Sequence, residues 1–87
     1  MNVSDEAIAI NKRFFLVIDT LIQRRKMRGL KTFTEKYGLN YWNVWSVKNE
    51  PSKHFLRPEW LAFLVRDYNV SAMYLLTGVG VMFADSK

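Results

Sequence analysis

The stretch TFTEKYGLNYWNVWSVK, residues 32–48, carries the signals of two short helices joined by a turn. It begins with TFTE, which matches the capping box S/T-x-x-E and places a helix N-terminus at Thr32. Gly38 suits the end of that helix because glycine adopts left-handed backbone conformations without steric cost. Asn40 is a favourable N-cap for a second helix that runs to about Lys48. The stretch therefore predicts two consecutive helices with a tight connection.

Three further helices are predicted around this pair. Their expected limits are Ser4 to about Met27, Pro58 to Asn69, and Ser71 to Gly78. Ser4 and Ser71 are N-cap residues, and Pro58 suits a first helical turn. Because no segment alternates as a strand does, we expect an all-α fold of five helices in a single domain, residues 1–87. Its core is expected over about residues 13–78, followed by an apolar tail, residues 79–87, without helical period.

The spacing of apolar residues predicts which helix faces are buried. Val44 and Val47 are i, i+3 neighbours and should share the buried face of the third helix. In the fourth helix the expected buried stripe comprises Leu61, Leu64, Val65 and Tyr68. In the polar loop before it, Phe55 and Leu56 are expected to anchor in the core.

Positive charge is concentrated in the middle of the chain. The 87 residues carry a formal charge of +5, whereas residues 24–57 alone contain nine Lys or Arg and two Glu, a formal charge of +7. This clustering predicts a polyanionic partner. The chain has no Cys, and no apolar run reaches the roughly 18 residues of a membrane helix. We therefore expect a cytoplasmic protein without disulfides and without a membrane partner.

The order of the helices, together with the segment DYNVSAMYLLTGVGVMF at residues 67–83, resembles the lambda-repressor-like (XRE, phage-repressor type) DNA-binding domains. The resemblance covers roughly residues 13–78 and implies a helix-turn-helix at the second and third helices. It implies a repressor-like DNA-binding transcriptional regulator that places the helix at 40–48 in the major groove; whether such a regulator represses or activates does not follow from the sequence. Two positions depart from the family pattern: Leu30 stands where many members have Gln, and Thr34 where Ala is usual.

Residues of the third helix are the expected base-reading positions: Tyr41, Trp42, Asn43, Ser46 and Asn49. If Val44 and Val47 face the core, Trp42, Ser46 and Asn49 form the stripe farthest from it. Trp42 can then contact thymine methyl groups, while an Asn side chain reads an adenine edge. Tyr41 and Trp45 lie on an adjacent stripe, and for these two we favour packing onto the second or fourth helix.

Basic residues around the third helix are the expected phosphate contacts: Lys31, Lys48, Lys53, His54 and Arg57. Such contacts fix the register of a protein on DNA and carry little sequence information. His54 is the only histidine, so a metal site or an acid–base role is not expected. We expect no enzyme activity and no cofactor, and no small-molecule ligand can be inferred.

Three functions remain open at this point. The first is sequence-specific reading of double-stranded DNA, with homodimerisation through Val79, Val81, Met82 and Phe83 as an accompanying prediction. The second is an interaction module of the same fold that contacts other proteins through Trp42, Trp45 and the tail. The third is binding of single-stranded nucleic acid by base stacking on the aromatic side chains.

Overall fold

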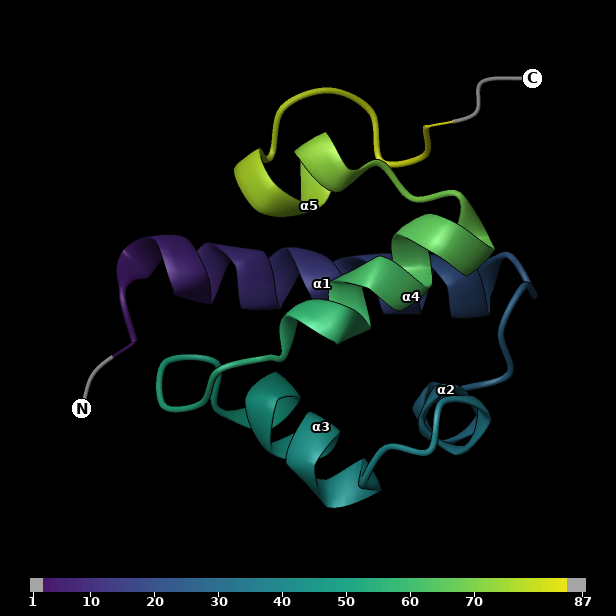
Figure 1. The fold of residues 1–87 in the computed structure, drawn as a ribbon, viewed down its shortest axis with the longest axis horizontal. Helices are drawn as coiled ribbons and strands as arrows, with labels where there is room; N and C mark the ends of the chain where they lie inside the picture. The colour runs from purple at the N-terminus through teal and green to yellow at the C-terminus, as the bar shows by residue number, and fades with distance from the viewer. Residues whose placement is uncertain (1–2, 85–87) are drawn as a thin grey trace.

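The first helix crosses the molecule, and four shorter helices pack around it (Figure 1). The computed structural model describes residues 3–84, whose helices are α1 (Asp5–Gln23), α2 (Leu30–Lys36), α3 (Tyr41–Asn49), α4 (Pro58–Tyr68) and α5 (Ala72–Thr77). In Figure 1, α2 and α3 lie on one side of α1 and α5 lies on the other. This confirms the prediction of an all-helical fold with five helices. No helix within residues 3–84 is both long enough and apolar enough to cross a membrane.

Phe14 of α1 lies at the centre of the hydrophobic core. Its side chain is fully buried, and its ring centroid lies 5.9 Å from that of Phe33 in α2 and 6.0 Å from that of Trp60 in α4. Ile18, Leu21, Leu64 and Leu75 complete the most deeply buried part of the core. Burial of one such large side chain contributes about 1.5–3 kcal/mol to stability. The buried residues form one apolar cluster with members in all five helices.

The helix caps predicted from the sequence are present at three N-termini. The side chains of Ser4, Asn40 and Ser71 each accept a hydrogen bond from a backbone N–H in the first turn of the following helix. Asn69 and Gly78 adopt left-handed conformations, with φ of 60° and 78°, directly after α4 and α5. These ends depend on local chemistry, which explains why sequence predicts them well.

The predicted end of the first helix at about Met27 is wrong, because α1 ends at Gln23. Arg25 takes a left-handed conformation with φ of 60°, and the Lys26 N–H donates to the Leu21 carbonyl at 2.9 Å. This six-to-one hydrogen bond is that of a Schellman motif, which stops the helix. The chain then turns back, and Met27 is buried in the core.

The predicted helix start at Thr32 is also wrong. α2 begins at Leu30, with Gly29 as its N-cap, and the Phe33 N–H donates to the Gly29 carbonyl at 3.2 Å. Thr32 is therefore an exposed residue within the helix. Thr34 is buried, and its hydroxyl donates to the Lys31 carbonyl at 2.8 Å, so a hydroxyl at this position stays hydrogen-bonded in the core.

The prediction of which side chains between residues 55 and 68 fill the core is partly wrong. Leu64 is fully buried and Leu56 packs on the core, as expected. Phe55 is 58% exposed, however, and Val65 is exposed as well. Trp60 is buried in their place, because the face of α4 toward α1 and α2 is centred on Trp60 and Leu64.

The tail folds back along the segment between α4 and α5. Val70 and Phe83 form an isolated antiparallel bridge, and the Ser71 N–H donates to the Met82 carbonyl at 2.8 Å. Phe83 packs against the core with the Arg24 guanidinium 4.7 Å from its ring centroid, whereas Val79 and Val81 are exposed. The predicted tail spans residues 79–87, of which 85–87 lie outside the described residues.

Candidate nucleic-acid interface

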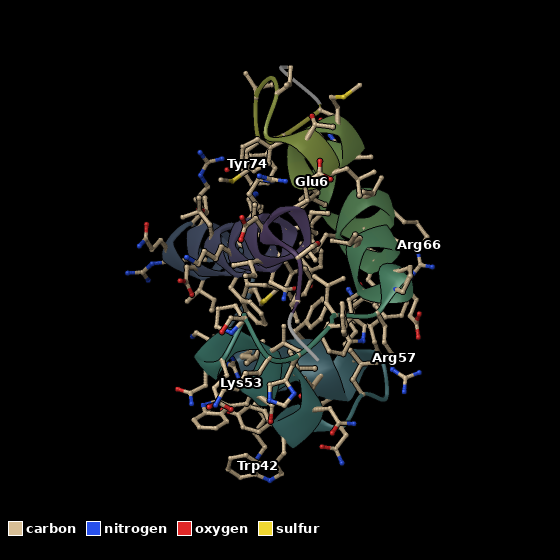
Figure 2. The ribbon with its side chains drawn as sticks, turned by 90° about the vertical axis from the view of Figure 1, so that its left-hand side faces the viewer. Glu6, Trp42, Lys53, Arg57, Arg66 and Tyr74 are labelled. Atoms are coloured by element: carbon tan, nitrogen blue, oxygen red, sulfur yellow. The ribbon has the colours of Figure 1, made fainter. Side chains whose placement is uncertain are left out.

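Helix α3 presents two opposite faces with different environments. Val44 and Val47 are buried against the core, as predicted, whereas Trp42 is 66% exposed. The Asn40 side chain accepts a hydrogen bond of 3.1 Å from the Asn43 N–H and fixes the start of the helix. Figure 2 shows Trp42 projecting at one end of the molecule, away from the other helices. The most exposed large side chain on the outward face of α3 is thus the aromatic ring of Trp42.

Tyr41, Trp42 and Trp45 form an aromatic cluster on this face. The ring centroids of Tyr41 and Trp42 are 5.1 Å apart, and those of Trp42 and Trp45 are 5.9 Å apart, both in edge-to-face geometry. Trp45 is 39% exposed. Tyr41 is half-buried. The rings hold one another in place, and the cluster offers a preorganised apolar surface to a partner.

The polar residues of α3 lie beside and beyond this cluster. Asn43 and Ser46 line a hollow of about 250 Å³ together with His54 and Arg57. The Ser46 hydroxyl donates to the Trp42 carbonyl at 2.8 Å, so its proton is already used within the helix. Asn49 is exposed at the end of α3. Of the predicted base-reading residues, the structure brings Asn43 and Ser46 together with two of the predicted phosphate contacts.

The basic residues around α3 differ in their surroundings. Lys53 Nζ lies 3.5 Å from Glu50 Oε2, and His54 Nε2 lies 3.4 Å from Glu50 Oε1. Lys48 Nζ lies 4.0 Å from Asp19 Oδ1 of α1. All three contacts are solvent-exposed, and pairs of this kind contribute little, so Lys48 and Lys53 can exchange their carboxylates for phosphates. Glu50, already counted in the charge of residues 24–57, lowers the positive charge beside Lys53 and His54.

Arg57 and Lys31 have freer positions. Both are exposed, and no carboxylate of residues 3–84 lies within 4.0 Å of either cation. Arg57 is the N-cap residue of α4 and lies at the rim of the hollow lined by Asn43 and Ser46. Figure 2 shows Trp42 at the lower end of the molecule, with Lys53 above it and Arg57 to the right.

Asn11 positions the loop that carries Lys53 and His54, and sequence reasoning missed this role. Asn11 lies within α1, which continues through it without a break. Its buried side-chain amide donates to the Pro51 carbonyl at 3.0 Å and to the His54 carbonyl at 2.9 Å. One signal was present: a polar residue stands among the apolar positions of a helix face.

A polar network holds α2 against α4 behind the aromatic cluster. The Tyr37 hydroxyl donates to Asp67, whose carboxylate also accepts two hydrogen bonds, of 2.9 and 2.8 Å, from Arg66. The hydrogen bonds from Arg66 and Tyr37 hold the pKa of Asp67 well below its usual range. Burial and the contact with Asp67 raise the pKa of the Tyr37 hydroxyl. The Tyr37 ring also stacks on Phe63 with a centroid distance of 4.0 Å.

Comparisons with known proteins give no assignment: no protein-family model matches the chain, and neither the curated proteins nor the solved structures yield a significant match. Within residues 3–84, no group of three or more His, Asp or Glu side chains is placed to hold a metal ion. Any functional assignment therefore rests on the geometry of α3 and its neighbours.

Proposed function

We propose that this protein is a sequence-specific double-stranded DNA-binding regulator, and that α2 and α3 act as a helix-turn-helix. The observation that carries the proposal is the exposure of Trp42, 66%, on a helix whose opposite face is buried through Val44 and Val47. A helix fixed in this way from behind can enter a major groove with its outward side chains foremost. The resemblance to lambda-repressor-like domains supports the same use of α3.

The chemistry of the outward face favours A·T base pairs. Trp42 supplies an apolar ring for thymine methyl groups, and Asn43 supplies an amide that can pair with the N6 and N7 edge of adenine. α3 contains no Arg or Gln, the residues that commonly pair with guanine or adenine edges. Arg57 and Lys53, both in the segment between α3 and α4, are our candidates for phosphate contacts beside the groove.

A second candidate function is protein recognition through the aromatic cluster. Trp42 and Trp45 are exposed side by side, and aromatic residues of this kind anchor protein interfaces. Fluorescence anisotropy distinguishes the candidates: labelled 20-base-pair duplexes and the matching single strands are titrated at two salt concentrations. A DNA reader binds the duplex more tightly and with steep salt dependence. Equal or stronger binding of single strands, or no binding of either, would contradict the proposal.

We further propose that the regulator reads paired half-sites as a dimer. One recognition helix contacts only a few base pairs, and two-fold symmetric pairing supplies the missing specificity. Val79 and Val81 are exposed in the tail, whereas Met82 and Phe83 pack inward, so the first two are the residues to test. Replacing Val79 and Val81 together by Ser should convert a dimer to a monomer in sedimentation equilibrium. A wild-type protein that is monomeric at all concentrations would contradict dimerisation.

A further inference from the structure

A basic hollow lies at the end of α1, away from the loop that carries Lys53. It has a volume of about 640 Å³ and is bounded by the end of α1, the segment joining α1 to α2, α2 itself and the end of α4. Arg25, Lys26, Arg28 and Lys36 surround it, and Tyr68 forms part of its wall. In Figure 1, the segment joining α1 to α2 and the segment joining α3 to α4 lie on opposite sides of the molecule.

The hollow has no acidic residue in its lining. Within the described residues, none of its four cations has a carboxylate within 4.0 Å. Lys36 Nζ lies 5.0 Å from the centroid of the Tyr68 ring and 5.3 Å from that of Tyr37, so cation–π contacts keep its charge beside the hollow. Like charges gathered in this way repel one another, and a bound anion relieves that repulsion.

Arg25 occupies a backbone position that favours glycine. It is the left-handed residue of the Schellman motif that ends α1, with φ of 60°. A non-glycine residue at such a position costs free energy, and strain of this kind concentrates at ligand sites. The Arg25 guanidinium lies at the edge of the hollow. A guanidinium can bind a phosphate through two parallel hydrogen bonds.

We propose that this hollow binds a nucleoside polyphosphate, with its phosphates against Arg25, Lys26 and Arg28 and its base near Tyr68. The volume lies within the range of small-ligand sites, and a concave site with an aromatic wall suits a nucleotide better than the convex backbone of a duplex. The hollow combines residues 22–36 with Tyr68 of α4, so the spacing of residues does not by itself predict it. The proposal does not depend on DNA reading by α3.

Isothermal titration calorimetry of the full chain with ATP, inorganic pyrophosphate and adenosine at low salt tests the proposal. ATP and pyrophosphate should bind saturably at one site, and adenosine should show no measurable binding because it lacks phosphates. Arg25→Gly should weaken ATP binding at least tenfold while leaving the melting temperature unchanged or higher, since glycine suits the left-handed position. Lys12→Ala, which removes an exposed cation from the first half of α1, should bind ATP as the wild type does.

Three results would overturn the proposal. The first is the absence of saturable binding of ATP and pyrophosphate to the wild type. The second is unchanged ATP binding by Arg25→Gly. The third is that the wild type does not bind ATP while Arg25→Gly lowers the salt slope of duplex binding by about one. In that case Arg25 contacts DNA phosphates instead of a nucleotide. ATP binding that Trp42→Ala leaves intact would show that this site and the α3 face act separately.

Discussion

The buried amide of Asn11 donates a hydrogen bond of 2.9 Å to the backbone carbonyl of His54, 43 residues further along the chain. A second hydrogen bond from the same amide reaches the Pro51 carbonyl at 3.0 Å. The loop that follows α3 is thereby fixed to α1 rather than left to its own short-range contacts. The positions of Lys53 and His54 beside the proposed DNA-reading face thus depend on one polar side chain in the longest helix.

Replacing Asn11 by Ala should destabilise the protein by about 1–3 kcal/mol, because two carbonyls lose their donor in a buried setting. Hydrogen exchange should increase in residues 50–56 more than in α2. Chemical denaturation and exchange measured by mass spectrometry check both effects. Lys12→Ala, one residue along α1 and exposed, is the matched control and should change stability by less than about 0.5 kcal/mol. Equal stability of Asn11→Ala and the control would contradict the positioning role.

Replacing Trp42 by Ala should leave stability nearly unchanged while reducing discrimination between preferred and unrelated duplexes. An exposed side chain contributes little to folding, whereas its contacts in a groove contribute to specificity. Thermal unfolding and competition binding measure the two effects separately. A large loss of stability would show that Trp42 serves the fold.

Val44→Ala, on the opposite face of α3, is the control for Trp42. It should destabilise the protein by roughly 1–3 kcal/mol through lost packing, since Val44 is fully buried. Its affinity for DNA should fall only as the folded fraction falls. Loss of specificity in the folded Val44→Ala protein would weaken the assignment of the outward face.

The charges around the α3–α4 loop should change DNA affinity in opposite directions. Arg57→Ala should weaken binding to all duplexes alike and lower the salt slope by about one, as loss of one phosphate contact does. Glu50→Gln should strengthen binding, because Glu50 lies within 3.5 Å of the Lys53 cation and 3.4 Å of His54. Anisotropy titrations between 50 and 200 mM salt, chosen from the range over which phosphate contacts are lost, check both variants. An unchanged slope for Arg57→Ala would remove it from the phosphate contacts.

The Tyr37–Asp67 pair should make stability depend on pH at both extremes. The pKa of Asp67 is depressed in the folded protein, so its contribution is present above the unfolded pKa of about 4 and is lost as pH falls below it. The pKa of Tyr37 is raised, so its contribution is present below the unfolded pKa of about 10 and is lost as pH rises above it. Melting temperatures across pH should show that Asp67→Asn flattens the acid limb and Tyr37→Phe the alkaline limb. If the melting temperatures of both variants vary with pH in parallel with the wild type, the Tyr37–Asp67 pair does not cause the pH dependence.

Local signals in the sequence were sufficient for much of the helical framework. Asn40, Ser71 and Gly78 mark helix ends through interactions with their immediate neighbours, and all three behave as predicted. The errors have a different origin. The helix start expected at Thr32 and the helix end expected at Met27 were displaced by the turn at Arg25, which turns the chain so that Met27 enters the core.

The candidate interface was only partly predictable for the same reason. The exposure of Trp42 follows from helical geometry, since the buried positions of Val44 and Val47 fix the outward direction. Contacts between distant segments, such as Asn11 with the loop after α3, have no signature in sequence spacing. The contact between the rings of Trp42 and Trp45, by contrast, follows from their i, i+3 spacing.

Selection from a randomised duplex library at two salt concentrations tests the proposed function most directly. If α3 reads bases, a short motif containing A·T pairs should be enriched and retained at the higher salt, and Trp42→Ala should lose that enrichment. Recovery of unselected sequence at both salt concentrations, or the same enriched motif from wild type and Trp42→Ala, would contradict base reading by α3.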